Sequence, residues 1–321
     1  MTFRSPINRF PVRFLTLTAL NHTGHPELMM KFILVFLISL SAVASPREEA
    51  QELLAKFQSY DSVVSRMEAF SQNFLDLPYG VGGPLGEGEQ GRYDQDPLYR
   101  FDTFDCTTFV ETVVGLALTQ DVNSFENQMD EIRYENGEVD YLKRNHFPSL
   151  HWVPNNIKNG LLKEINHLIL PLNETKMAEA VINLPGWLKA IKIEEIKVPL
   201  ATLEERQNIL EELRAHASEY SPIIARIEYL PISTLLVKPQ VLKLIPNGAI
   251  VNFVRPNWDL TATTGTHMNV SHQGIIFQKK AGTILRHAST TGKVMDSVLI
   301  EYLKKFENHP TLKGIHLMQV N

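Results

Sequence analysis

Cysteine is almost missing from this sequence, because 321 residues contain only Cys106. One cysteine cannot form a disulfide within the chain, so a fold held together by disulfides is excluded. The residue is then either a small buried core residue or a reactive thiol. Composition alone favours the core residue, and the sequence around Cys106 has to decide between the two roles.

Runs of positive charge and long hydrophobic stretches are also scarce. The formal net charge is -5, and basic residues form only short pairs such as Lys279-Lys280, so nucleic-acid binding has no electrostatic basis. The apolar run at residues 32–40 is shorter than the ~20 residues that span a bilayer. Apolar residues make up 44% of the chain, as expected for a globular protein. We therefore expect no nucleic-acid partner.

Residues 29–45 have the layout of a secretory signal peptide. Lys31 precedes the apolar run, and small residues follow it up to Ala44, where cleavage is expected. The sequence therefore predicts an upstream segment and signal peptide at 1–44. A single exported domain at 45–321 would follow, without a membrane anchor after cleavage. We expect a bacterial protein that is periplasmic or secreted. A buried N-terminal helix is the alternative explanation of the apolar run.

The remaining chain has helices first and strands later. Helical spacing of apolar residues predicts helices at 47–75, from Cys106 onward, at 123–147 with a break at Asn136-Gly137, and at 202–220. Glycine and proline predict irregular structure at 77–100 and 148–175, and a helical insertion is expected around 176–230. Alternating β-branched segments predict strands at 247–255, 268–277 and 282–289. This order predicts an α+β fold.

The sequence around Cys106 predicts that this residue opens a helix. Asp105 can act as the N-cap, and an apolar stripe follows at helical spacing: Phe109, Val113, Leu116 and Ala117. Backbone N–H groups and the helix dipole favour an anion at this end. We therefore expect a lowered thiol pKa and a larger fraction of thiolate, the nucleophilic form. A thiolate nucleophile still needs a base, which is usually a histidine.

Two histidines lie on predicted strands that can present them on one face. His272 and His287 flank residues 279–282, which have the sequence of a hairpin turn. If Gln278 pairs with Thr283, His287 becomes the diagonal neighbour of His272, roughly 7–8 Å away. A slip of one residue would put the two side chains on opposite faces. In the first register one histidine can take the thiol proton and the other can orient its ring, as in a catalytic triad.

Other roles remain open for the same side chains. A single histidine on a strand is more often structural than catalytic, and so is a single cysteine. His267, His272 and His287 could instead bind zinc, with a nearby carboxylate or thiolate as a further ligand. A helix-opening cysteine together with two histidines on one face favours a nucleophile over these alternatives. We expect neither a metal nor a cofactor.

The order of these motifs resembles that of the NlpC-type papain-like cell-wall hydrolases. Among them the chain is most similar to the N-acetylmuramoyl-L-alanine amidase-like family. The similarity rests on five stretches: LPYGVGGPLGEGE (77–89), FDCTTFVETVVGLAL (104–118), IRYENGEVDYLKRNHF (132–147), SHQGIIF (271–277) and RHAS (286–289). The run DCTTFVE within the second stretch is the specific one.

The resemblance implies a papain-like fold, in which the helix that carries the nucleophile packs on an antiparallel sheet. Extra helical insertions would belong to this chain. The resemblance also implies Cys106 as the nucleophile, His272 as the general base and His287 as the residue that orients the base. It further implies that Tyr79 lines the cleft near the nucleophile.

The activity implied is hydrolysis of the amide between N-acetylmuramic acid and L-alanine in peptidoglycan fragments (muropeptides), through a thioester. Arg133, Arg144 and His146 are candidate contacts to substrate carboxylates, with solvated surface charge as the other explanation. Glu111, one turn along the cysteine helix, is expected to be a structural partner. An endopeptidase that cuts γ-D-glutamyl-diaminopimelate bonds and an inactive cell-wall-binding protein on the same scaffold are the alternative functions.

Overall fold

The computed structural model describes residues 45–81 and 83–321. The upstream segment and signal peptide predicted at 1–44 lie outside the described residues. The signal peptide therefore stays a prediction. From residue 45 onward the described chain folds as one unit. No helix among the described residues is long and apolar enough to cross a membrane.

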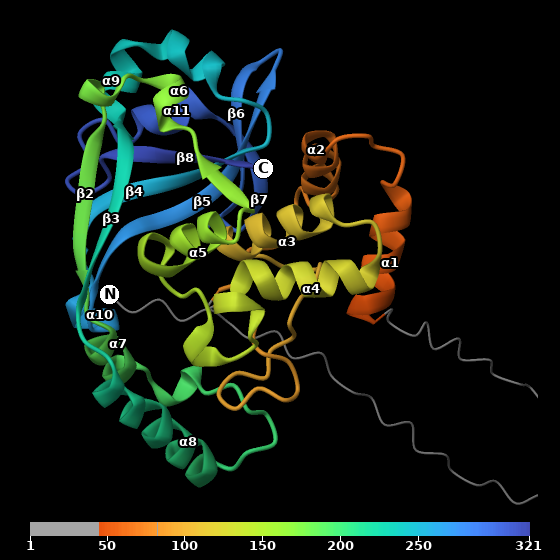
Figure 1. The fold of residues 1–321 in the computed structure, drawn as a ribbon, viewed down its shortest axis with the longest axis vertical. Coiled ribbons are helices and arrows are strands. Elements are labelled where there is room, and N and C mark those ends of the chain that lie inside the picture. Colours follow the sequence, from red (N-terminus) through yellow and green to blue (C-terminus); the bar gives the residue numbers. More distant parts are fainter. Residues whose placement is uncertain (1–44, 82) are drawn as a thin grey trace, which may run out of the picture. The chain divides into compact units, whose positions relative to one another are not determined.

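The described strands pair into one eight-stranded antiparallel sheet (Figure 1). Its order is β2-β3-β8-β4-β5-β6-β7, and β1 pairs with β8 beside this path. The strands are β1 Leu162–Glu164, β2 Lys176–Ile182, β3 Ile223–Pro231, β4 Ala249–Asp259, β5 His267–Lys279, β6 Gly282–Ser289, β7 Lys293–Val298 and β8 Gly314–Val320. The predicted mixture of helices and antiparallel sheet is therefore confirmed.

The three predicted strands are confirmed as β4, β5 and β6, which lie next to one another in the sheet. The last strand of the chain, β8, was not predicted, although it lies between β3 and β4. Its sequence GIHLMQV is buried almost throughout. A strand that is covered on both faces has no alternation of apolar and polar residues to reveal it.

The helices precede, interrupt and flank the sheet. They are α1 Pro46–Lys56, α2 Val63–Asn73, α3 Cys106–Leu118, α4 Val122–Arg133, α5 Val153–Lys158, α6 Asn166–Ile169, α7 Leu184–Ala190, α8 Leu203–Ala215, α9 Ile232–Val237, α10 Thr261–Thr264 and α11 Leu299–Lys304. The predicted helix that Cys106 opens is therefore present as α3.

Two of the helix predictions need correction because the first helices end earlier than expected. The predicted helix at 47–75 is two helices, since the Ser62 hydroxyl accepts the Ser65 N–H at 3.1 Å and starts α2 anew. The predicted helix at 123–147 ends at Arg133, before the expected break. Tyr134 already has extended backbone, with φ of -125° and ψ of 151°, and Asn136 and Gly137 follow with φ of 55° and 71°, in the left-handed region.

The segment at 148–175, predicted as irregular, contains α5, β1 and α6. Its prolines open helical turns here instead of preventing them. Pro154 lies in the first turn of α5, where a backbone N–H has no helical partner to lose.

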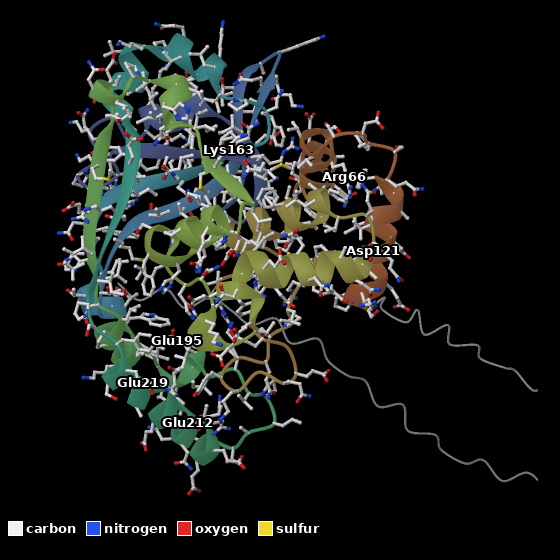
Figure 2. All side chains as sticks on the ribbon, viewed as in Figure 1. Arg66, Asp121, Lys163, Glu195, Glu212 and Glu219 are labelled. Carbon is white, nitrogen blue, oxygen red and sulfur yellow. The ribbon has the colours of Figure 1, made fainter. Side chains whose placement is uncertain are left out.

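The predicted insertion at 176–230 begins and ends with strands, because β2 and β3 pair along their whole length, with Ala180 opposite Ala225. Between them lie α7 and α8, and the capping box predicted for Thr202 and Glu205 is present. Figure 2 shows acidic side chains such as Glu212 on this helical part. These helices have a small apolar core of their own, built around Ile209 and similar residues.

Helices cover both faces of the sheet and so create two cores. On one face α1–α4 pack against side chains such as Ile250 and Ile275. On the other face α9 and α11 pack against Val251 and Ile276, the next residues along the same strands. Because successive strand residues point to opposite faces, α3 meets the sheet on one side and α11 on the other.

The hairpin of β5 and β6 has the predicted register, with Gln278 opposite Thr283. Gly274 makes the two strands fit closely near the histidines. A Cβ atom at this position would lie 2.6 Å from Leu285 Cδ1 and 3.1 Å from His287 Cβ. Only glycine therefore allows His287 to lie as close to β5 as it does.

Candidate active site

Cys106 is the first residue of α3, and Asp105 caps the helix as predicted. The Asp105 carboxylate accepts the Thr108 N–H at 2.8 Å, and the Asp105 N–H donates to the Thr108 hydroxyl at 3.0 Å. This reciprocal pair fixes the first turn of the helix. Cys106 is half-buried as a residue and is held at the end of a helix whose next turns are buried.

The Cys106 thiol lies against strand β5. The backbone N–H of Gln273, the residue after His272, donates to the sulfur and lowers the thiol pKa. The pairing of β5 with β6 runs only from Lys279–Gly282 to Ile275–Arg286, so Gln273 lies beyond the last pair of this ladder. Its side chain is held from β4, because Gln273 Nε2 donates to Asn252 Oδ1 at 2.7 Å. The thiol therefore lies one residue from His272 along a fixed strand.

The two histidines are in direct contact, which confirms that they share one face. His272 Nε2 and His287 Nδ1 are 2.6 Å apart, and His287 Nε2 lies 3.3 Å from the Ser297 hydroxyl. One consistent set of protons has His272 Nε2 donating to His287 Nδ1 and His287 Nε2 donating to Ser297. In that tautomer His272 Nδ1 carries no proton and is free to accept one.

Aromatic rings surround the histidine pair. The Phe253 ring centroid lies 5.6 Å from that of His272, and the Tyr302 ring lies edge-on to His287 at 5.3 Å. Burial, with His287 alongside, lowers the pKa of His272 to about 3. Burial likewise lowers the pKa of His287 to about 4, although Asp296 acts in the opposite direction. Both rings are therefore neutral at pH 7.

The pKa of the Cys106 thiol departs from the prediction. Burial and the negative charge of Asp105 raise it to about 12, and they outweigh the lowering by Gln273, Thr107 and the residue's own N–H. The helix end acts in the predicted direction, but it is the smaller effect. With His272 neutral, no positive charge offsets burial. The free site therefore holds a thiol beside a neutral imidazole.

Tyr79 lies near the thiol, as the family resemblance implies. Burial raises the pKa of its phenol to about 12, and the nearby Cys106 and Asp105 side chains act in the same direction. Its backbone is held on both sides, by a bridge to Phe104 and by a hydrogen bond of 2.9 Å from its N–H to the Gly292 carbonyl. The phenol is therefore protonated and able to donate a hydrogen bond.

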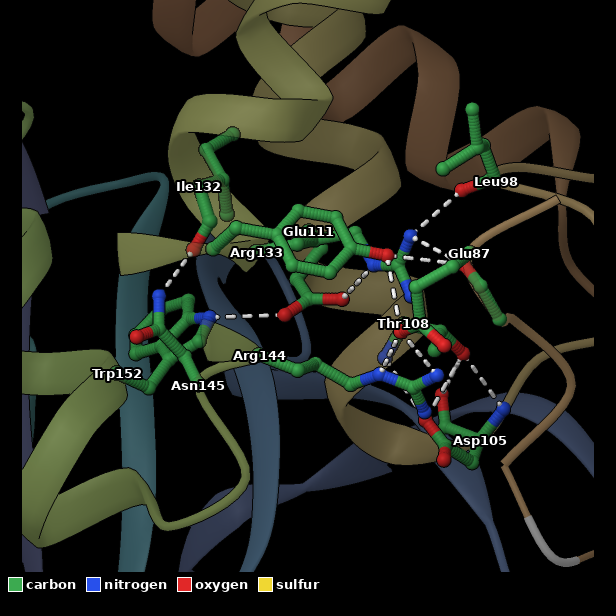
Figure 3. A network of polar contacts seen from close by, with 12 residues as sticks. Glu87, Leu98, Asp105, Thr108, Glu111, Ile132, Arg133, Arg144, Asn145 and Trp152 are labelled. Atoms are coloured by element: carbon green, nitrogen blue, oxygen red, sulfur yellow. Dashed lines mark hydrogen bonds and ion pairs between the residues drawn. The ribbon is translucent and has the colours of Figure 1, made fainter. Parts of the chain in front are cut away.

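Arg133 does not point into this site, which corrects its predicted role as a substrate contact. Only 3% of its side chain is exposed, and its Nε lies 3.5 Å from Glu111 Oε2. Figure 3 shows the guanidinium within a buried polar network, in which it also donates to the Leu98 carbonyl at 2.9 Å. Trp152 donates to the other Glu111 oxygen at 3.0 Å. Glu111 is therefore a structural partner, as expected.

Arg144 and His146 also have partners within the protein, so their predicted contact with substrate is not supported. Arg144 forms an ion pair with Glu87 (Figure 3) and a second one with Asp94 at 3.2 Å. His146 Nε2 lies 2.7 Å from the Tyr141 carbonyl, and burial lowers its pKa well below the usual value. Arg144 therefore holds the segment after α4 against the loop at 83–100, while His146 is hydrogen-bonded within that segment.

The zinc alternative does not match the arrangement of the histidines. His267 lies at the start of β5, 3.7 Å from the Asp259 carboxylate, while His272 and His287 contact each other. Within residues 45–81 and 83–321, histidine, cysteine and acidic side chains form no group of three or more that could hold a metal ion.

A cavity of about 290 Å³ adjoins His272 and was not predicted from the sequence. It is lined by Arg255, Trp258, Ser271, His272, Ser289, Thr290, Tyr302, Phe306 and Leu312. A larger hollow of about 580 Å³ lies at the β5–β6 turn, beside Pro239 and Lys280, and His272 is not among its lining residues. The smaller cavity can therefore hold a substrate group next to His272, while Cys106 and His287 are not among its lining residues.

Comparisons with known proteins indicate the family of the chain and its fold. The model of the AmiA-like family, described as N-acetylmuramoyl-L-alanine amidase-like, matches residues 69–312. A search of proteins with curated functions found no match. Among solved structures, a protein from Legionella pneumophila is 35% identical, with a TM-score of 0.82 over 85% of this chain and 94% of the other.

Two further solved structures resemble the chain in fold. An N-acetylmuramoyl-L-alanine amidase from Bacteroides uniformis is 23% identical, with a TM-score of 0.57 over 81% of this chain and 99% of the other. A protein from Bacteroides fragilis, described as a putative xylanase, is 26% identical, with a TM-score of 0.55 over 78% of this chain and 100% of the other. The fold is thus shared by proteins with different descriptions, and the site must indicate the chemistry.

The charge on Asp105 predicts a change in thiol reactivity. We expect Asp105→Asn to be alkylated by iodoacetamide about tenfold faster at pH 8, because a neighbouring negative charge disfavours the thiolate. Asparagine caps a helix as well as aspartate does, so the melting temperature should change little. Asp102→Asn removes an exposed carboxylate that is paired with Arg100 and serves as the control. Equal rates in all three proteins would show that Asp105 does not control the thiol.

The buried pair of Arg133 and Glu111 predicts a loss of stability. We expect Arg133→Met to lower the free energy of unfolding by about 3 kcal/mol in urea titrations, because it leaves a buried carboxylate unpaired. The double variant Arg133→Met, Glu111→Gln should recover part of this loss, since both partners are then neutral. An unchanged stability would argue against the pair and return Arg133 to a role in substrate binding.

Proposed function

The chain belongs to the N-acetylmuramoyl-L-alanine amidase-like family, and we propose that it hydrolyses the amide between N-acetylmuramic acid and L-alanine in peptidoglycan fragments. The resemblance inferred from the sequence is confirmed by the family match over residues 69–312. This family suggests a hydrolase of cell-wall amides. The nucleophile, the intermediate and the muropeptide substrate are our proposal.

One observation supports a cysteine mechanism above the others. The helix-opening thiol of Cys106 meets the N–H of Gln273, and the ring of the preceding residue, His272, is held 2.6 Å from His287. The thiol thus meets the residue next to the candidate base, and the candidate base contacts its candidate orienting residue, which supports the roles that a triad requires. The nucleophile helix also packs on an antiparallel sheet. We propose on these grounds that the fold is papain-like and that these three residues are catalytic.

The first step transfers a proton as the bond to carbon forms. His272 Nδ1 takes the proton from the Cys106 thiol while the sulfur attacks the amide carbonyl carbon, and the carbonyl oxygen gains the negative charge. Both groups are neutral beforehand, since burial sets their pKa values to about 12 and about 3. His287 accepts from His272 Nε2 throughout and keeps the ring in the tautomer that leaves Nδ1 free.

The helix end and Tyr79 stabilise the oxyanion in this proposal. The backbone N–H of Cys106 is in the first turn of α3, where N–H groups have no helical acceptor. The Tyr79 phenol remains protonated, with a pKa raised to about 12, and can donate as a second group. The imidazolium of His272 then protonates the departing amine, and water hydrolyses the thioester that remains.

The same proposal includes export of the protein. The signal-peptide layout of residues 29–45 would carry the domain into the periplasm or the medium, where peptidoglycan fragments occur. A single cysteine that forms no disulfide suits a nucleophile in such an oxidising compartment.

The first test is a digest of a disaccharide-anhydromuropeptide with the purified protein, read by mass spectrometry. We expect release of a free stem peptide that begins with L-alanine. Cys106→Ala should abolish this release and leave the melting temperature within a few degrees, because the thiol contributes little packing. A product cut inside the stem would make the protein an endopeptidase. Intact substrate after prolonged incubation would favour an inactive binding protein.

The pH dependence tests the histidine pair independently. His272 must be neutral to accept a proton, so a lowered pKa extends activity toward acid pH. We expect the acidic limb of kcat/KM to lie at about pH 3 to 4, set by the pKa values of about 3 and about 4. No alkaline limb from Cys106 should appear below pH 9, since its pKa is about 12. An acidic limb at the ordinary value near 6.5 would contradict the buried neutral pair.

A further inference from the structure

Arg255 lies on an irregular part of strand β4 beside His272. In the pairing of β4 with β5, Val254 lies opposite Val270 and Trp258 lies opposite Met268, so β4 has extra residues between these pairs. Asn257 within this bulge has φ of 50°, in the left-handed region. Bulges next to active sites commonly redirect a side chain. The register also shifts between Phe253, opposite His272, and Val254, so Arg255 lies two residues beyond the regular ladder.

Neutral groups hold the Arg255 guanidinium in place. Its Nε donates to the Ser271 hydroxyl at 2.9 Å and its Nη1 donates to the Thr311 hydroxyl at 2.5 Å. The guanidinium carbon lies 4.7 Å from the Trp258 ring centroid. These contacts use two of the five N–H donors of arginine and leave the remaining donors directed elsewhere.

Arg255 has no carboxylate partner in residues 45–81 and 83–321. The ion pairs of the described chain do not include it, whereas Arg133 and Arg144 are both paired. Partial burial lowers its pKa, and the nearby Tyr302 phenol acts in the opposite direction. A partly buried arginine remains cationic at neutral pH. The positive charge is therefore available to an anion from outside the protein.

The cavity beside His272 gives such an anion access to Arg255. Arg255, Ser271, His272 and Tyr302 all line this space of about 290 Å³. It has aromatic walls and convergent polar groups, which is the usual composition of a ligand site. A carboxylate is the natural partner, because the planar fork of arginine matches it bidentately.

The chemistry of the substrate limits which carboxylate this can be, and this step rests on the proposed amidase function. In a muropeptide the lactyl carboxyl group of the sugar is consumed in the scissile amide. The free carboxylates are therefore on the stem peptide, on D-glutamate and on diaminopimelate. We propose that Arg255 binds a stem-peptide carboxylate on the leaving-amine side of the scissile bond, and so makes the site selective for anionic stems.

The test compares three substrates that differ only in carboxylates: anhydromuramoyl-L-Ala-γ-D-Glu-diaminopimelate, its D-isoglutamine form, and its diaminopimelate amide. We expect one amidation to reduce kcat/KM of the natural protein about 10- to 100-fold, the range for a hydrogen bond to a charged group. The sensitive substrate identifies which carboxylate is bound. Arg255→Gln should lose a similar factor on the first substrate and show no further loss on amidation.

Two other variants complete the design. Arg226→Gln removes a similar charge from the exposed side of β3, where Arg226 pairs with Glu179, and should retain the natural sensitivity to amidation. Arg255→Lys keeps the charge without the bidentate fork, so its sensitivity to amidation should lie between that of the natural protein and that of Arg255→Gln. This variant replaces Arg255→Gln in the test if Arg255→Gln does not fold. An Arg255 variant that remains as sensitive to amidation as the natural protein would overturn the proposal.

Binding separates this inference from the proposed function. If the natural protein cleaves none of the three substrates, the amidase proposal fails, and calorimetric titration with the same compounds still tests Arg255. Weaker binding of one amidated compound, with the difference abolished in Arg255→Gln, would support the carboxylate site alone. Equal binding of all three compounds to the natural protein would overturn it.

Discussion

The end of the β5–β6 ladder is the constraint on which the candidate site depends. The last recorded pair is Ile275–Arg286, and beyond it the N–H of Gln273 donates to the Cys106 sulfur instead of to a neighbouring strand. A helix end is thereby fixed at the residue that follows His272. Because side chains alternate along a strand, the imidazole leaves β5 on the opposite face from the Gln273 side chain. Gly274 then keeps β6 close enough for His287 to reach that imidazole.

Burial, more than the helix dipole, sets the charges in this arrangement. A thiol at the first turn of a helix is expected to ionise readily, but Asp105 and the loss of solvent act against this at Cys106. The same loss of solvent keeps both imidazoles neutral. Before the reaction the Cys106 thiol and the His272 imidazole are both neutral and form no ion pair. Charge therefore develops only when a substrate carbonyl is present to accept it. Preformed N–H donors at the helix end are then worth most, because they stabilise a charge that is new to a dry site.

Features of the site that depend on neighbouring residues could be predicted from the sequence. Features that depend on contacts between segments far apart in the chain could not. The cap at Asp105, the register at Gln278 and the contact of His272 with His287 follow from short-range patterns. Strand β8 was missed because it is buried on both faces and shows no alternation. The thiol pKa was wrong in direction because burial is a property of the packed structure. The role of Arg133 could not be predicted either, since its partner Glu111 is far from it in sequence and close to it only in the fold.

Three arginines illustrate how partners decide the role of a charged side chain. Arg133 and Arg144 lie in stretches that resemble the family motifs, yet each has its charge balanced by a carboxylate of the protein. A paired guanidinium has little left to offer a ligand, and removing its partner costs more than the pair contributes. Arg255 lies outside those motifs, and its contacts are hydroxyl groups and an aromatic ring. Such contacts orient a guanidinium without neutralising it. The positive charge of Arg255, which no carboxylate of the described residues balances, lies beside His272 and can therefore be neutralised by a carboxylate of the substrate.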